Sequence, residues 1–420
     1  MNYALIDIDF EEIGPFLCNK FNNAAYFPSA SRRGWTVSNV LALGVHDSTE
    51  NYTGALEKKV DQLIAANNDW VFGHLGYELH SELENTVATK GSSDGFSKLF
   101  FFVPETVIFQ DENQLRIGSI TQSQNENIIQ LIERFKIASP QREDVELNCA
   151  TPYERYAEQG AEILRHIHRG DIYEINYCID FSGYAELIDS SSIFQILQKT
   201  ADAPFSVLYK QNKSWLMCAS PERYISKNGN RVISQPIKGT RKRGKNSEED
   251  FALIEELQSD VKERMENIMI VDLVRNDLSR IAARGTVEVT ELCGIHTFNT
   301  VHQMISTVSC IVPDDIRISD IVHATFPMGS MTGAPKISAI RIAAEMEDQP
   351  RGIYSGSVGM ITPDGDFDFN VVIRSITWNA ENGIVSAKTG SAFTEKASAL
   401  KEYEECMLKG EMMKNALKRM

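Results

Sequence analysis

The chain has 420 residues and carries 58 acidic against 42 basic side chains, which gives a formal net charge of −16. An acidic surface repels nucleic acid and anionic membranes, so both are poor candidate partners, and a site for an anionic substrate must carry local positive charge. Hydrophobic residues make up 42% and charged residues 24%, as in ordinary soluble globular proteins. At roughly 150 residues per domain, this length suggests two or three structural units.

Cysteine usage and the first residues of the sequence favour the cytoplasm. The seven cysteines are scattered and form no CxxC pair, so we expect neither a disulfide framework nor a zinc site. Residues Met1–Glu12 have no basic segment and no long apolar run, so no signal peptide is predicted. No segment approaches the roughly 18 consecutive apolar residues of a membrane span.

The pattern divides the chain near residue 150, into an irregular region 1–150 and a more regular region 151–420. The elements predicted in the first region are β-rich runs at Asp69–Leu75 and Leu99–Phe109, a helix at Ser123–Lys136 with Ser123 as its N-cap, and a polar linker at Ser139–Asn148. We expect the two regions to be interwoven in one globule.

The second region opens with a helix at Tyr153–Arg169, for which Thr151 is the predicted N-cap and Gly170 the end. Further strands are predicted at Ile172–Phe181, Trp215–Ala219, Arg231–Ser234 and Gly383–Ala387, and further helices at Ser247–Asp260, Val261–Ile281, Ala334–Met346 and Ser398–Arg419. The runs Tyr354–Ile361 and Phe367–Thr377 flank a Pro-Asp-Gly-Asp turn, which indicates a hairpin. Helices and antiparallel strands without βαβ alternation predict an α+β fold of layered antiparallel sheets with flanking helices.

Lys238 is the first candidate for chemistry. It lies in the stretch Gln235–Thr240, where proline and glycine predict a turn after a strand. Partial burial beside Ile237 would lower the pKa of the lysine and free its amine as a nucleophile. On spacing alone, the basic residues 241–245 that follow favour an ordinary solvated lysine instead.

Two pairs of glutamates are candidates for a metal site. Glu263 and Glu266, like Glu402 and Glu405, stand three residues apart and therefore share a helix face. Brought face to face, the pairs would offer hard oxygen ligands suited to Mg²⁺. Two solvated acidic helix faces are the more common outcome of such spacing.

Tyr354 and Arg374 are expected on paired strands of the predicted hairpin. Arginine is the natural bidentate clamp for a carboxylate. A structural salt bridge explains the arginine about as well, and both interpretations stay open.

In their order along the chain and in their residues, these motifs resemble those of the chorismate-binding enzyme family. This family includes anthranilate synthase component I, aminodeoxychorismate synthase component I, isochorismate synthase and salicylate synthase. The matching stretches are Gly170–Asn176, Ser220–Arg223, Pro236–Thr240, Lys262–Glu266, Ile270–Asp277, Phe326–Lys336, Arg351–Gly359, Ile373–Arg374 and Glu402–Glu405. They cover most of region 151–420, which would be the chorismate-binding catalytic region, whereas region 1–150 matches loosely around Gly73–Tyr77. The resemblance implies the chorismate-utilising enzyme fold.

The resemblance also implies roles for single residues. Glu222 would be the general acid. Mg²⁺ would be held by Glu266, Glu402 and Glu405, with Glu263 ligating directly or through water. The substrate's two carboxylates would be held by Gly239, Thr240, Tyr354, Arg374, Gly390 and Lys409.

The lysine at position 238 makes this motif similar to that of the aminodeoxychorismate synthases, whereas anthranilate synthases carry alanine there. It implies that Lys238 adds to C2 of chorismate and expels the C4 hydroxyl, after which ammonia adds at C4 and expels the lysine, a step of folate and para-aminobenzoate biosynthesis. Ammonia would come from a glutamine amidotransferase subunit, because this sequence has no Gly-x-Cys-x-Gly elbow for glutamine hydrolysis. The alternatives are an anthranilate or isochorismate synthase-type enzyme and an inactive chorismate-binding subunit.

Three places depart from the family pattern. Glu174 stands where the family usually has glutamine, Gln303 where it has histidine, and Ser391 and Ala392 follow Gly390 in place of a triple-glycine loop. Near a dianionic substrate, Glu174 is expected to be protonated or paired with a cation. We expect Glu174 and Gln303 to alter the proton chemistry of the site without abolishing it.

Overall fold

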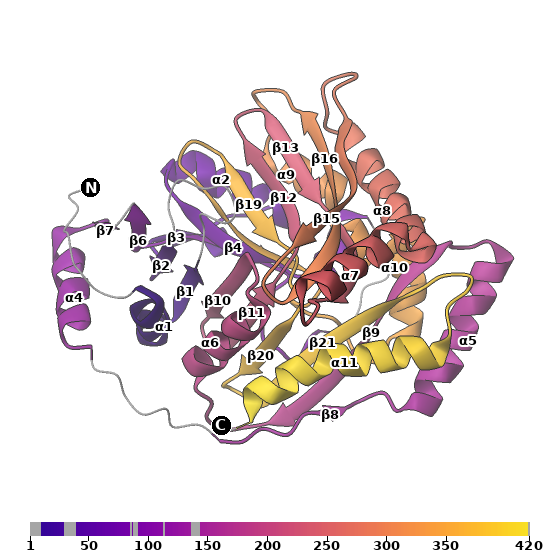
Figure 1. Cartoon of the computed structure of the whole chain (residues 1–420). Helices are drawn as coiled ribbons and strands as arrows, with labels where there is room; N and C mark the ends of the chain where they lie inside the picture. The colour runs from indigo at the N-terminus through magenta and orange to yellow at the C-terminus, as the bar shows by residue number, and fades with distance from the viewer. Residues whose placement is uncertain are drawn as a thin grey trace.

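The computed structural model describes residues 10–28, 39–84, 86, 91–111, 114–135 and 143–418. Two large antiparallel sheets face each other in the middle of the molecule, and helices cover their outer faces (Figure 1). This confirms the predicted α+β fold of layered antiparallel sheets. None of the described helices is both long enough and apolar enough to span a bilayer.

Sheet A has eleven strands among the described residues. In spatial order they are β17 (Gly333–Ala334), β9 (Glu174–Tyr184), β21 (Ile384–Phe393), β20 (Ser375–Asn379), β11 (Ser214–Ser220), β10 (Phe205–Gln211), β1 (Asn23–Phe27), β2 (Val40–Leu43), β6 (Thr106–Asp111) and β7 (Gln114–Ser119), with β8 (Asn148–Cys149) paired to β9.

Sheet B has ten strands in the same part of the chain. In spatial order they are β14 (Ile237–Lys242), β16 (Val301–Ile311), β13 (Arg231–Gln235), β12 (Arg223–Asn228), β19 (Phe367–Asn370), β18 (Ser357–Ile361), β4 (Val71–Leu75), β5 (Leu99–Val103) and β3 (Asp47–Ser48), with β15 (Glu288–Thr297) paired to β16. Because β1 pairs with β10 and β4 with β18, residues on both sides of position 150 share both sheets.

Three large apolar cores hold the layers together, and a small fourth cluster consists of Leu257, Cys293 and Met304. The inner core lies between the sheets and joins Phe27 and Leu216 of sheet A to Phe72 and Phe102 of sheet B. The outer core of sheet A packs against α1 (Phe10–Lys20), α4 (Gln122–Glu133), α5 (Tyr153–Arg169), α6 (Ser190–Ala201), α10 (Lys336–Met346) and α11 (Ala399–Leu417). The outer core of sheet B packs against α2 (Leu56–Asn67), α3 (His80–Leu83), α8 (Val261–Ser279) and α9 (Ile318–Thr325). Helix α7 (Ser247–Ser259) lies against β14 and β15.

Helix α5 has the predicted bounds, and Gly170 ends it in the left-handed conformation that glycine adopts most readily (φ 85°). The predicted N-caps are wrong. Pro152 occupies the N-cap of α5 in place of Thr151, and α4 begins one residue before Ser123. Thr121 and Gln124 form a capping box there, which satisfies two free backbone groups at once and so fixes the start of α4.

The predicted hairpin is confirmed only in its first half. Strand β18 pairs with β19 around the turn, with Gly359 opposite Phe369. The chain then leaves sheet B, and β20 joins sheet A instead. Tyr354 and Arg374 therefore lie outside the strands and are not paired across the hairpin as predicted.

The predicted linker Ser139–Asn148 lies partly outside the described residues. From residue 143 onward it is anchored, because Val145 and Leu147 are buried in the outer core of sheet A. All seven cysteines are free thiols.

Arg351 connects separate segments of the fold through hydrogen bonds and an ion pair. Its guanidinium donates to the carbonyls of Asn176 in β9 (2.8 Å) and Met331 (2.6 Å). It also pairs with Glu347 at 2.6 Å and lies 4.3 Å from the centre of the Tyr77 ring. Because both charges of this pair are buried, each depends on the other to offset its lost hydration.

Replacing Arg351 with methionine should therefore lower the free energy of unfolding by about 3–5 kcal/mol, because Glu347 is left buried without its cation. Urea unfolding followed by circular dichroism measures the loss. Arg275→Met is the matched control, since its 2.9 Å pair with Asp272 lies on the surface of α8 and should matter little. Equal losses in the two variants would contradict the account.

Candidate active site

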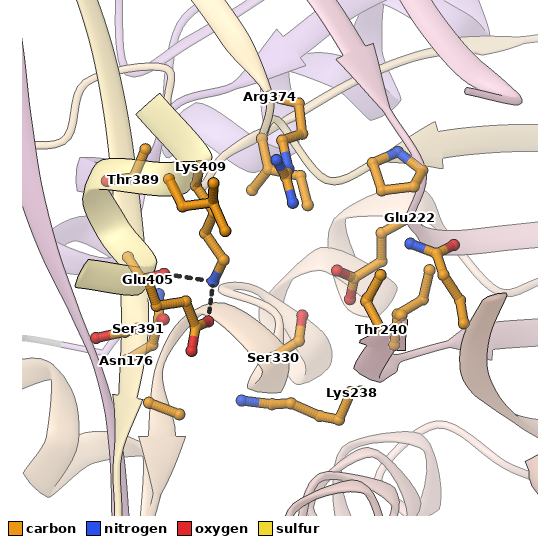
Figure 2. A pocket seen from close by; sticks show the side chains of 18 of the residues that line it. Asn176, Glu222, Lys238, Thr240, Ser330, Arg374, Thr389, Ser391, Glu405 and Lys409 are labelled. Atoms are coloured by element: carbon orange, nitrogen blue, oxygen red, sulfur yellow. Dashed lines mark hydrogen bonds and ion pairs between the residues drawn. The ribbon is translucent and has the colours of Figure 1, made fainter. Parts of the chain in front are cut away.

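One cavity of about 580 Å³ gathers every residue that the sequence nominated for catalysis, substrate binding or metal binding. These residues are Glu222, Lys238, Gly239, Thr240, Glu263, Glu266, Tyr354, Arg374, Gly390, Glu402, Glu405 and Lys409. They come from both sheets and from helices α8 and α11, and Figure 2 shows Glu222, Lys238, Arg374 and Lys409 converging on one space. Their individual roles stay predictions.

Positive charge exceeds negative charge among the residues that line the cavity. Seven are basic, namely Lys238, Arg241, Lys242, Lys262, Arg374, Lys388 and Lys409, and five are acidic, namely Glu222, Glu263, Glu266, Glu402 and Glu405. The protein as a whole carries −16, so this local excess of two positive charges opposes the overall field. A cavity of this kind suits an anionic ligand, and a dianion would neutralise the excess.

A bulge in an edge strand directs Lys238 into the cavity. The register of β14 against β16 shifts between Ile237 and Thr240, and Gly239 between them takes a φ of 89°. A side chain is disfavoured at that angle, and a Cβ at Gly239 would also lie 3.1 Å from Leu257. Bulges re-aim neighbouring side chains, so Lys238 belongs to a bulged strand and not to the turn that the sequence predicted.

The amine of Lys238 forms an ion pair with Glu174 at 2.6 Å, and Glu174 is buried while Lys238 is largely shielded from solvent. Burial by itself lowers the pKa of Lys238, but Glu174, Glu266 and Glu222 outweigh burial and raise it above its usual value. The prediction that burial frees the amine was therefore wrong in direction for the substrate-free site. The prediction that Glu174 would be paired is confirmed.

Glu222 has the properties of a buried acid. It follows Pro221 in the connection between β11 and β12, and only 4% of its surface is exposed. Burial raises its pKa to about 7, although Ser330 and Lys238 act in the opposite direction. A carboxylic acid that keeps its proton near neutrality can donate that proton to a leaving group.

The two predicted glutamate pairs do face each other, and Lys262 bridges Glu266 of one pair and Glu402 of the other. Lys262 lies 3.7 Å from Glu266 and 3.5 Å from Glu402, and Lys409 lies 2.6 Å from Glu405. Burial raises the pKa of Glu266 to about 7. Burial also acts to raise the pKa of Glu405, but Lys409 outweighs it, so that pKa lies below its usual value.

These carboxylates fit a divalent cation by the chemistry of their oxygens. Glu266 Oε1 is buried and has no hydrogen-bond partner in the described structure, and Lys262 Nζ lies 3.7 Å from it, beyond hydrogen-bond distance. A buried carboxylate oxygen in this state can accept a cation at closer range. As the side chains stand, the described residues contain no group of three acidic, histidine or cysteine side chains close enough to bind a metal. Binding would therefore require the glutamates to exchange their lysine partners for the ion.

Arg374 and Lys409 are the cations best placed for a substrate carboxylate. Arg374 has a left-handed backbone (φ 52°) in the crossing from β19 to β20, a conformation that costs roughly 1–3 kcal/mol and clusters at functional sites. Burial lowers its pKa, and its guanidinium has no ion pair with another described residue. Lys409 donates to the carbonyl of Gly390 at 2.8 Å.

The cavity also contains residues to which the sequence assigned no role. Asn176, Ser330 and Lys262 line it and lie within the motif stretches, so the motifs could have indicated them. Lys388 had no such signal, because it reaches the cavity only through its place in β21, where it pairs with Asp180 at 3.3 Å.

Comparison with known proteins agrees with this geometry. The family model described as chorismate binding enzyme matches residues 24–415. An anthranilate synthase component I-like protein of Synechocystis sp. is 31% identical over 372 residues, which are 87% of this chain and 76% of that protein. Aminodeoxychorismate synthase component 1 of Escherichia coli is 35% identical over 253 residues. That match covers 60% of this chain and 55% of the relative, so it spans about half of the relative's length.

Solved structures share the fold. Anthranilate synthase component I from Streptococcus pneumoniae superposes with a TM-score of 0.76 at 22% identity, over 99% of this chain and 92% of that one. At this identity the likeness concerns the fold alone. The family match over most of the sequence decides the classification: this chain belongs to the chorismate binding enzyme family.

Proposed function

We propose that this chain is component I of an aminodeoxychorismate synthase, which replaces the C4 hydroxyl of chorismate with an amine. The observation that carries the proposal is the lysine at position 238, whose amine lines the cavity together with Glu222. Relatives named aminodeoxychorismate synthase component 1, such as those of Escherichia coli and Bacillus subtilis, are each 35% identical over the matched region. Relatives named anthranilate synthase are also similar, so the product is the point to be tested.

The proposed chemistry uses Lys238 as a covalent nucleophile. Its neutral amine adds to ring C2, the two ring double bonds shift, and the C4 hydroxyl leaves as water with a proton from Glu222. Ammonia then adds at C4, the double bonds shift back, and the C2–N bond breaks to release Lys238. Two successive displacements divide one difficult substitution into two easier steps.

The charges of the cavity support a substrate with two carboxylates. Arg374 and Lys409 supply cationic donors on one side, and Figure 2 shows both pointing into the cavity. Glu266, Glu402 and Glu405 would hold Mg²⁺. When bound, the ion would orient a substrate carboxylate and offset its charge.

The function is tested by the product formed from chorismate, Mg²⁺ and an ammonium salt, identified by mass spectrometry. Lys238→Ala should lose 4-amino-4-deoxychorismate formation by roughly 100-fold or more, the scale typical of a positioned catalytic group. Lys245→Ala, in the same basic stretch but exposed, should keep the wild-type rate. A C2-amino product or isochorismate from the wild type would overturn the proposal, as would full activity in Lys238→Ala.

The metal is tested separately by calorimetric titration with Mg²⁺. Glu266→Gln and Glu405→Gln should each weaken binding by roughly 10-fold or more, because hard cations need charged oxygen ligands. Glu404→Gln changes the exposed neighbour of Glu405 on the same helix and should bind as the wild type does. Full turnover in excess chelator would show that no metal is required.

A partner is the remaining part of the proposal. The designation component 1 in the relatives' names implies a second component, and ammonia at neutral pH is mostly non-nucleophilic ammonium. We expect the isolated chain to use ammonium salts, better at higher pH, and to ignore glutamine. Adding the glutamine amidotransferase from the same source should confer glutamine-dependent turnover. Glutamine use by the chain alone, or no gain with any such partner, would contradict this expectation.

A further inference from the structure

The ion pair between Glu174 and Lys238 joins the two sheets at the cavity. Glu174 is the first residue of β9 in sheet A, and Lys238 lies in β14 at the edge of sheet B. Their 2.6 Å contact connects side chains that are 1% and 12% exposed.

The backbone around Glu174 holds its side chain in place. Ile175 enters the outer core of sheet A, so Glu174 and Asn176 share the opposite face of β9, and Asn176 lines the cavity. Strand β17 closes over this segment and pairs Ala334 with Glu174. Gly333 is required for that approach, since a Cβ there would collide with the carbonyl of Glu174.

The second carboxylate oxygen of Glu174 is buried and has no hydrogen-bond partner in the part of the chain that the structure describes. Glu174 itself is not among the residues that line the cavity. It therefore stands behind Lys238, in contact with the amine and outside the space for substrate. A buried carboxylate with an unoccupied oxygen can accept a proton from its neighbour.

Other charged groups also face Lys238. The pKa of Lys238 is raised by Glu266 from α8 and by Glu222 from the β11–β12 connection. Lys238 in turn lowers the pKa of Glu405 from α11. Only Glu174 forms a hydrogen bond with its amine among the described residues. The local path for the lysine proton is therefore the 2.6 Å contact with Glu174.

We propose that Glu174 is a positioning residue for Lys238, which fixes the amine between the two sheets and takes up the proton that the amine loses before it reacts. This rests on the proposed function. The ammonium of Lys238 passes one proton to Glu174, and the neutral amine then adds to C2 while Glu222 protonates the leaving hydroxyl. When ammonia has added at C4 and Lys238 is released, Lys238 recovers its proton from Glu174. The new ammonium group gives a proton to Glu222, and the balance is chorismate plus ammonia to product plus water.

The decisive variant is Glu174→Gln, which keeps the shape and removes the charge. Without the carboxylate the ammonium is less stabilised, so the amine becomes neutral at lower pH. The acid limb of the pH–rate profile, measured at a constant concentration of free ammonia, should move down by roughly 1 to 3 pH units. The KM for chorismate should stay within about twofold, because Glu174 does not line the cavity. A uniformly lower rate with an unmoved limb would indicate a merely structural role and overturn the proposal.

A second measurement does not depend on turnover. Reductive methylation of Lys238, followed by mass spectrometry across pH in metal-free enzyme, reports when its amine is neutral. The midpoint should fall in Glu174→Gln, and Glu174→Asp, which retains a carboxylate, should stay near the wild type. Asp180→Asn removes a different carboxylate–lysine pair from β9 and should leave the midpoint unchanged.

The two measurements separate the possible failures. If the wild type makes no aminodeoxychorismate but the methylation midpoint is lower in Glu174→Gln, the proposed function is refuted. The role of Glu174 in positioning Lys238 is then still upheld. An unmoved methylation midpoint in Glu174→Gln overturns the role of Glu174. If that variant does not fold, Glu174→Ala is measured in its place, and an unmoved midpoint there overturns the role in the same way.

Discussion

Compensation of buried charge is the constraint on which the site depends. A charged side chain removed from water costs several kcal/mol unless a partner offsets it. The cavity meets this requirement at Lys238, which pairs with the buried Glu174, and at the buried Glu266 and Glu402, which share Lys262 as a partner. Lys409 and Glu405 also pair, but both of their side chains are partly exposed. A metal ion or an anionic ligand that binds these paired groups therefore does so by exchanging partners.

The layered fold brings these charges together from distant parts of the chain. Sheet A contributes Gly390 and the carboxylate of Glu174, and sheet B contributes Lys238. The other paired glutamates come from helices α8 and α11, which pack on the outer faces of the sheets. No single supersecondary unit contains the site. Its geometry thus depends on how the sheets are fixed to each other, and the buried pair Arg351–Glu347 contributes to this through its hydrogen bond to the Asn176 carbonyl in β9.

The sequence predicted those features that are encoded locally. The apolar stripe and the glycine after it correctly predicted the bounds of helix Tyr153–Arg169, and the i, i+3 spacing correctly placed each pair of glutamates on one side of its helix. Features that depend on distant residues were missed. The pKa of Lys238 shifts opposite to the prediction because Glu174 pairs with it. Glu174 lies 64 positions away in the sequence, so the residues around Lys238 do not reveal it. Tyr354 and Arg374 were misplaced because nothing local indicates that the chain changes sheets after Asn370.

The fold leaves the choice of product to a few side chains. An anthranilate synthase component I and the isochorismate synthase MenF of Escherichia coli both share this architecture, with TM-scores of 0.76 and 0.79, so a common scaffold does not determine the reaction. Residue 238 lies on a bulge in an edge strand, where its side chain is directed by the backbone of Gly239 and is not part of any core. Its side chain can therefore change without disturbing an apolar core, provided that Glu174, the buried carboxylate paired with it, changes as well. The chemistry at this point of the cavity can therefore diverge while the two sheets stay the same.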